Sequence, residues 1–159
     1  MIADIIAFFV YAYAGATLEH LSYFIMGKTY YYRLSNPITT AFPIYSLSAF
    51  LVIFINDYLD TYALKNNKNS ISSIITKILV FGFVLTLLEY VTGLLVGAGK
   101  TANVDCRITG WNYSDEKYNI DGIISLNHFI IWGFLGLAVT YIHPKLMNFI
   151  NCGLNCVNN

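Results

Sequence analysis

The sequence predicts an all-α fold, a four-helix transmembrane bundle. The first reason is composition: 57% of the residues are hydrophobic and 11% are charged, with a mean hydropathy of +0.57, whereas soluble domains carry about 25% charged residues. The second reason is that the apolar residues gather into four long runs. We therefore expect residues 1–159 to form a single integral, multi-pass membrane domain with the lipid bilayer as its surroundings.

The predicted spans cover residues 5–26, 43–58, 74–96 and 123–142. A helix needs about 20 apolar residues to cross the hydrocarbon core. The first run lacks the basic leading segment of a secretory signal, so we expect an uncleaved span. The second run is the shortest and opens at Pro43, where a proline suits the first turn of a helix. A re-entrant or strongly tilted segment is the alternative for this run.

The connections between the runs differ in character. Residues 65–73 are polar and rich in turn-forming residues, so they separate two halves of the chain. Residues 97–121 form a connection that is long for an unstructured loop and contains Trp111, Tyr113 and Tyr118. These aromatic residues predict an ordered cap at the membrane interface. Lysine and arginine are balanced between the two sides, so the orientation stays open.

The two halves suggest tandem two-helix repeats. Glu19 lies in the phrase Thr-Leu-Glu-His of the first run, and Glu89 lies in Leu-Leu-Glu-Tyr of the third. Each half then continues with a polar segment and a second apolar run. Such repeats would be related by an axis along the membrane normal. A chance likeness between two amphiphilic spans is the alternative.

The two acids predict a polar core. A carboxylate within a span costs at least ~2.5 kcal/mol and usually faces a partner or a wet cavity. At the helical period each acid shares a face with small residues, which let helices pack closely. These faces comprise Ala12, Gly15, Ala16, Glu19, Ser22 and Tyr23 on the first run, Gly82, Thr86, Glu89, Thr92, Gly93 and Gly97 on the third, and Ser125, His128, Trp132, Gly136 and Thr140 on the fourth. A carboxyl group buried there is expected to hold its proton unless a cation or several donors lie nearby.

A combination of motifs carries a family resemblance. The chain contains Leu-Glu-Tyr-Val-Thr-Gly at 88–93, Trp-Asn-Tyr-Ser at 111–114, Asn-Ile-Asp-Gly-Ile at 119–123, Trp-Gly-Phe-Leu-Gly at 132–136 and His-Pro at 143–144. This combination resembles the bacterial membrane family named putative ABC-transporter type IV, or CmpB-like, and its animal relatives called transmembrane protein 229. The first half matches more loosely, at Glu19, Arg33 and the Pro-Ile-Tyr stretch that begins at Pro43.

The resemblance implies a permease-like component and comes with two departures. Asn112 stands where the family motif has aspartate, and Ser46 stands where it has glycine. If the family aspartate binds a cation or a proton, Asp115 on the same loop is the candidate replacement. The sequence has no Gly-x-x-x-x-Gly-Lys-Ser/Thr phosphate loop, so transport driven by ATP would need a separate ATPase subunit.

No cofactor or metal site is expected. Three scattered cysteines do not make a disulfide framework or a zinc site. Cys152 and Cys156 lie near the end of the chain, on a predicted short interfacial helix after Pro144, as acylation sites or as unmodified thiols. A net charge of zero gives no argument for nucleic acid as a partner. A homo-oligomer through the glycine faces, or a separate membrane subunit, is the candidate partner.

The favoured interpretation is a polar core that binds a small polar ligand or ion. The candidate ligand-binding residues are Glu19, Glu89, His128, Arg33, Trp111, Asn112, Tyr113, Asp115, Asn119 and Trp132. Two other classes stay open. One is an intramembrane enzyme acting on lipid, with a glutamate and His128 in acid–base roles, which we favour less. The other is a purely structural membrane component, in which the acids pair with donors on neighbouring helices.

Overall fold

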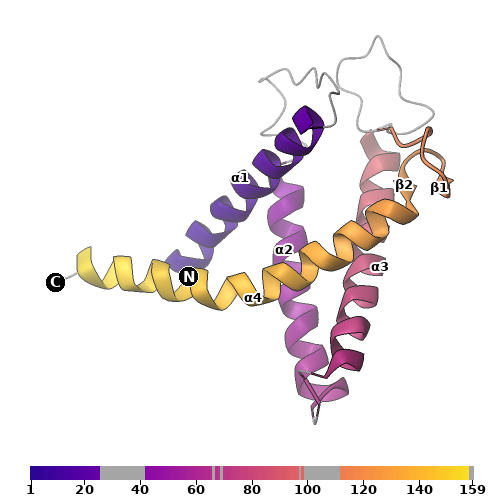
Figure 1. Ribbon diagram of the computed structural model, residues 1–159. Coiled ribbons are helices and arrows are strands. Elements are labelled where there is room, and N and C mark those ends of the chain that lie inside the picture. Colours follow the sequence, from indigo (N-terminus) through magenta and orange to yellow (C-terminus); the bar gives the residue numbers. More distant parts are fainter. Residues whose placement is uncertain (26–41, 66, 69, 97, 99–111, 158–159) are drawn as a thin grey trace. The chain divides into compact units, whose positions relative to one another are not determined.

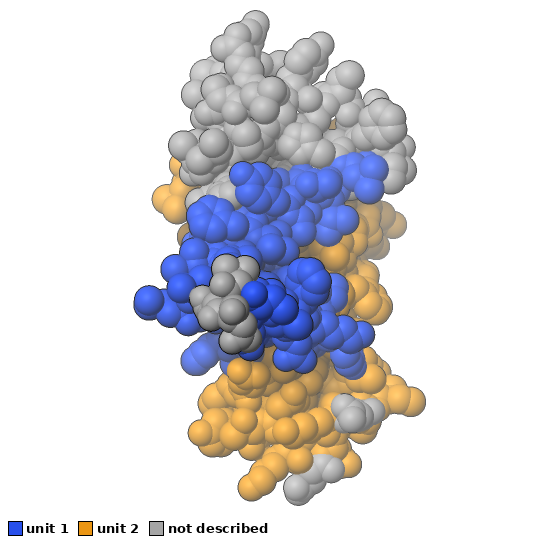
Figure 2. Space-filling model, turned by 90° about the vertical axis from the view of Figure 1, so that its left-hand side faces the viewer, with its two compact units in different colours: residues 1–54, 139–159 blue, residues 55–138 orange. Residues whose placement is uncertain are grey.

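The computed structural model describes residues 1–25, 42–65, 67–68, 70–96, 98 and 112–157. Within these ranges the fold is all-α, with four long helices and one small two-stranded hairpin (Figure 1). The chain divides into two compact units, residues 1–54 with 139–159, called unit 1, and residues 55–138, called unit 2 (Figure 2). The predicted all-α class is confirmed, whereas the single membrane domain and the tandem repeats stay predictions.

The four helices follow the four apolar runs with shifted ends. They are α1 (Ile2–Ile25), α2 (Phe42–Tyr58), α3 (Ile71–Val96) and α4 (Leu126–Val157). Pro43 lies in the first turn of α2, as predicted. A π-helical turn, η2 (Leu59–Ala63), follows α2 directly.

Helix α4 is longer than predicted. The sequence predicted a span ending at residue 142 and a separate short helix after Pro144, but α4 runs through Pro144 to Val157 as one helix of 32 residues. A proline inside a helix removes one hydrogen bond and kinks or breaks most helices. Here the segment beyond it stays helical because Leu146, Met147 and Ile150 pack into the core of unit 1.

Two helices meet the length and composition of a membrane span. Among the described residues these are Ile71–Leu95 and Leu126–Cys156, while Ile2–Leu18 is apolar but shorter. At 1.5 Å per residue, a helix of 32 residues extends about 48 Å, which exceeds the ~30 Å hydrocarbon core. Length and apolar composition, taken over the described residues, therefore support two of the four predicted spans, and the multi-pass arrangement stays a prediction.

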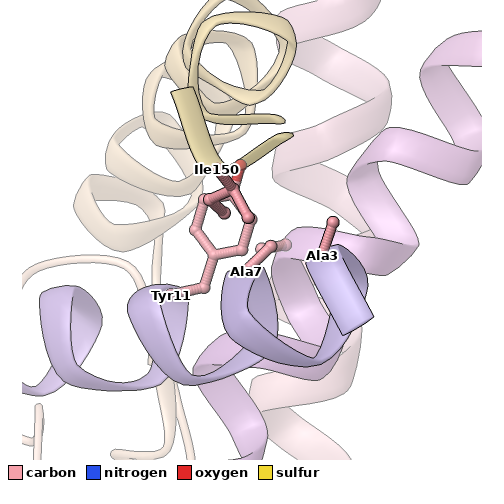
Figure 3. Close-up of a cluster of buried hydrophobic side chains, with 5 residues drawn as sticks. Ala3, Ala7, Tyr11 and Ile150 are labelled. Atoms are coloured by element: carbon pink, nitrogen blue, oxygen red, sulfur yellow. The ribbon is translucent and has the colours of Figure 1, made fainter. Parts of the chain in front are cut away.

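Unit 1 has an apolar core built from α1, α2 and the C-terminal part of α4. Ala3, Ala7 and Tyr11 lie four residues apart on one face of α1, and they pack with Ala49 and Ile150 (Figure 3). Burying a side chain as large as isoleucine contributes about 1.5–3 kcal/mol. The two alanines allow α4 to approach α1 closely, so the core is narrow and depends on these small side chains.

Unit 2 is held by glycine contacts between α3 and the N-terminal part of α4. A Cβ atom added to Gly82 would lie 2.7 Å from the carbonyl oxygen of Phe129, and one added to Gly136 would lie 2.7 Å from Cβ of Phe81. Gly133 meets the carbonyl oxygen of Ile78 in the same way. Gly82 and Gly136, two members of the small-residue faces predicted for α3 and α4, thus lie at the contact between these helices.

An ion pair between the buried Lys77 and the partly buried Asp60 joins α3 to η2 in unit 2. Lys77 Nζ lies 2.8 Å from Asp60 Oδ1, and Asn56 Nδ2 donates to Asp60 Oδ2 at 3.2 Å. Lys77 is only 8% exposed, so its ammonium group depends on Asp60 for compensation. At the start of the same helix Ser70 acts as the N-cap, because its Oγ accepts from the backbone N–H of Ser73 at 3.2 Å.

Candidate functional site

Residues 112–125 fold into an ordered hairpin that precedes α4. Strand β1 (Asn119–Ile120) pairs antiparallel with β2 (Ile124–Ser125). Asp121 and Gly122 have φ of 55° and 68°, and the N–H of Ile123 donates to the carbonyl of Ile120 at 2.9 Å. Positive φ at both central positions is the pattern of a type I′ turn, for which Asp-Gly is a favoured pair. The predicted cap is therefore ordered in its described part.

Two asparagines of the hairpin hold its backbone. Asn119 Nδ2 donates to the carbonyl of Glu116 at 2.7 Å, and its Oδ1 accepts from the N–H of Gly122 at 3.0 Å. Asn112 Oδ1 accepts from the N–H of Ser114 at 2.9 Å and from the Ser114 hydroxyl at 2.6 Å. Because this turn needs only a side-chain oxygen at position 112, asparagine can replace aspartate there. Asp115 lies exposed on the same turn.

Glu89, in the last third of α3, is buried, with 7% of its surface exposed. Trp132 Nε1 donates to Oε2 of Glu89 at 2.7 Å, and the Tyr113 hydroxyl donates to Oε1 at 3.0 Å. The first donor comes from α4 and the second from the hairpin, so two elements meet α3 at one carboxyl group. The prediction that Glu89 lies on a packed face is confirmed.

The two donors to Glu89 differ in whether they can also accept a hydrogen bond from it. An indole N–H can only donate, whereas a phenol hydroxyl can donate or accept. Glu89 can therefore be ionised and accept from both groups, or carry a proton on Oε1 and donate it to the Tyr113 oxygen. Both states use the same heavy-atom positions, so the arrangement accommodates gain and loss of a proton without rebuilding the site.

A second acid, Glu116, lies at the start of α4. The Ser125 hydroxyl donates to its Oε2 at 2.6 Å, and Asn127 Nδ2 donates to the same oxygen at 3.3 Å. His128 Nδ1 lies 3.0 Å from Ser125 Oγ and 3.5 Å from Glu116 Oε2. Ser125 is also the N-cap of α4, because its Oγ accepts from the N–H of His128 at 3.3 Å. The carboxylate thus lies at the positive end of the helix dipole.

Tyr113 connects the two acidic groups. Its ring stacks on the His128 ring, with centroids 3.8 Å apart and planes inclined by 17°, while its hydroxyl binds Glu89. A further bond, from the Tyr90 hydroxyl to Asp121 Oδ2 at 3.0 Å, ties the hairpin turn to α3. The carboxyl group of Glu89 and the hairpin are therefore linked directly through the hydroxyl of Tyr113.

The structure brings together four of the predicted site residues. Glu89, Tyr113, His128 and Trp132 form one cluster, and Asn112, Asp115 and Asn119 belong to the hairpin that carries Tyr113. Arg33 and Trp111 lie outside the described residues. Glu19 lies in α1, but its side chain is outside the described set, so a core shared by Glu19 and Glu89 stays a prediction.

Sequence reasoning missed Glu116. In the sequence it is one acid among several polar residues of a long connection. The available signal was Ser125 directly before the apolar run of α4, because an N-cap serine and a nearby acid are typical of helix starts.

A family model described as putative ABC-transporter type IV matches residues 6–156. The chain belongs to this family. No curated protein and no solved structure matches it. The family name relates the chain to membrane transport, and the match includes most of α1 and α4, all of α2 and α3, and the hairpin. In this member of the putative ABC-transporter type IV family, the cluster around Glu89 is built from the motifs that carried the resemblance.

Proposed function

We propose that the chain is a multi-pass membrane protein, a permease-like component whose polar core binds a small polar ligand or ion at Glu89. The observation that carries this proposal is the carboxyl group of Glu89, buried on a helix that is long and apolar enough to span a membrane and reached by donors from two other elements. An ionisable group at such a position is expensive and is normally retained for function.

In this mechanism the ligand and the proton compete for the same atom, Oε1 of Glu89. In the protonated state Oε1 of Glu89 donates its proton to the Tyr113 oxygen. A ligand that donates a hydrogen bond to Oε1 takes the place of that proton, so binding releases a proton and release takes one up. Because Tyr113 belongs to the hairpin, the same exchange loosens or tightens the cap, with His128 and Trp132 lining the cluster.

The remaining candidate residues extend this site in the proposal. Glu19, Arg33 and Trp111 stay candidate ligand-binding residues on the sequence argument alone, and Asn112, Asp115 and Asn119 belong to the hairpin segment that carries Tyr113. The family name also supports a separate ATPase or membrane subunit as a partner, because the chain itself has no phosphate loop.

A structural role is the second candidate, and one observation favours it. Both oxygens of Glu89 accept hydrogen bonds from protein donors, as expected of a group that fastens the hairpin and α4 to α3. Substitution by glutamine separates the two candidates. Its oxygen can accept from Trp132 while its NH₂ group donates to the Tyr113 oxygen, so it imitates the protonated acid and preserves the fastening.

The experiment uses the full chain reconstituted in liposomes that contain a pH-sensitive dye. Gradients of ammonium, alkali cations and small neutral solutes are imposed in turn, and proton movement is recorded. We expect at least one solute to move protons in the wild type and Glu89→Gln to reduce the rate at least tenfold. Asp57→Asn, at an exposed acid on α2, is the matched control and should leave the rate unchanged. Equal rates in Glu89→Gln and the wild type, or no proton movement with any solute, would contradict the proposal.

A further inference from the structure

The hydroxyl group of Thr86 is buried without a hydrogen-bond partner among the described residues. Thr86 is 8% exposed, and its Oγ1 is inaccessible to solvent. The two other threonines of α3 bond back to their own helix: Thr76 donates to the carbonyl of Ser72 at 2.9 Å and Thr92 to that of Leu88 at 2.8 Å. This back-bonding is the ordinary behaviour of a threonine inside a helix, so Thr86 is the exception.

Thr86 lies next to the Glu89 cluster. It precedes Glu89 by three residues, which places the two Cβ atoms about 5–6 Å apart on one face of the helix. Gly82, one turn earlier on this face, meets the backbone of Phe129, and Glu89 accepts from Trp132. Thr86 is therefore on the side of α3 that faces α4, between a backbone contact and the buried acid.

We propose that Thr86 contacts the ligand of this site and that the ligand is a small ammonium-type cation with N–H donors. The inference rests on the proposed function of Glu89. Buried polar groups are rarely left without a partner, and an exception calls for a missing one. A carboxylate can only accept, so a molecule that joins it to Thr86 must donate to it. Cationic donors make the stronger bonds to a carboxylate in a site shielded from water.

The packing around Thr86 limits the size of the ligand. At Gly82 the backbones of α3 and α4 are so close that even one added methyl group would meet the Phe129 carbonyl. Because this close contact lies one turn from Thr86, the proposed ligand group is a small one, as ammonium and the head of methylammonium are. A quaternary ammonium group has the same positive charge, but it has no N–H donors and is larger than ammonium.

Thermal unfolding of the purified full chain tests the inference. The probes are ammonium and methylammonium chloride, compared with tetramethylammonium and sodium chloride at equal ionic strength. We expect the first two to raise the Tm of the wild type by several degrees and the other two to have no such effect, because a ligand that binds only the folded state stabilises it. An equal shift with sodium or tetramethylammonium would overturn the ligand class.

Thr86→Val is the decisive variant, because valine has the shape of threonine without the hydroxyl group. We expect it to raise the Tm in the absence of any probe, since an unpaired buried hydroxyl is removed, and to lose the shift with ammonium. Thr92→Val is the matched control and should keep the shift, because Thr92 bonds to its own helix. If Thr86→Val does not fold, Thr86→Ala replaces it, and we expect this variant to lose the Tm shift with ammonium as well.

The outcomes separate this inference from the proposed function. One outcome is that ammonium raises the Tm of Thr86→Val as in the wild type but not that of Glu89→Gln. That result would show that Thr86 does not contact the ligand, and it would still support a ligand site at Glu89. The absence of any shift in the wild type overturns the ammonium-type ligand, and the proton measurement in liposomes then decides on Glu89 by itself.

Discussion

The indole nitrogen of Trp132 lies 2.7 Å from Oε2 of Glu89, a residue 43 positions earlier in the chain. Because an indole N–H can only donate, this oxygen is an acceptor whether Glu89 is protonated or not. The bond therefore holds α4 to α3 in both states. The hydrogen bond between Tyr113 and Oε1 can reverse its direction. Oε2 therefore holds α4 in both states, whereas Oε1 can gain or lose the proton.

Replacing Trp132 by phenylalanine should destabilise the protein by about 2 kcal/mol, because a buried acceptor loses its donor. Urea unfolding in detergent micelles measures the free energy of unfolding. Phe134→Leu is the control, since Phe134 is exposed on the same helix. A change below about 0.5 kcal/mol in Trp132→Phe would show that the bond to Glu89 does not fasten the helices.

Removing the hydroxyl group of Tyr113 should loosen the hairpin. Tyr113→Phe keeps the ring that stacks on His128 and deletes the bond to Glu89. A bond worth up to about 1.4 kcal/mol corresponds to amide exchange up to about tenfold faster in residues 112–125. Hydrogen exchange measured by mass spectrometry reports the rate. Tyr118→Phe, at an exposed ring, should leave it unchanged, and equal rates in both variants would refute the coupling.

Two glycine-to-alanine substitutions should change the free energy of unfolding in opposite directions. Gly82→Ala places a methyl group against the Phe129 carbonyl and should destabilise the protein by about 1–3 kcal/mol. Gly153→Ala meets nothing within 4 Å, and it should stabilise α4 by up to about 1 kcal/mol because alanine favours the helix. Chemical unfolding of the two variants side by side is the measurement. A neutral Gly82→Ala would contradict the close backbone contact.

The ion pair between Lys77 and Asp60 can be tested by substituting its two residues singly and together. Lys77→Met leaves the partly buried carboxylate of Asp60 without its cation and should cost up to about 3 kcal/mol. Combining it with Asp60→Asn removes the unpaired charge, so the double variant should regain at least half of the loss. Additive losses in the double variant would show that Lys77 and Asp60 stabilise the fold independently of each other.

Much of the helical framework could be predicted because apolar runs end where polar connections begin. The ends of α2 and α3 lie close to the predicted ones, and Pro43 marks the start of α2. The C-terminal part of α4 could not be predicted in the same way. Its continuation beyond Pro144 depends on Ile150, which belongs to the same buried cluster as Ala3 near the other end of the chain, and no local pattern reveals this.

The site shows the same division between local and distant signals. Glu89 was predictable because an acid in an apolar run is costly, and Trp132 because it lies on the same helical face as His128 and the small residues. Glu116 resembles an ordinary surface acid in the sequence. Only the hairpin, whose turn requires positive φ at Asp121, brings it to Ser125 and His128. Thr86 lay on a predicted face, but its lack of back-bonding is visible only in three dimensions.

Asn112 has a consequence for how this family can vary. The residue shapes the cap with its side-chain oxygen alone, accepting from Ser114, and a carboxylate and an amide offer that oxygen equally well. An exchange between asparagine and aspartate at this position therefore changes the charge of the hairpin segment, while the hydrogen bonds to Ser114 stay possible. Under the proposed function, variation at position 112 changes the charge of the hairpin segment and leaves the two hydrogen bonds to Glu89 in place.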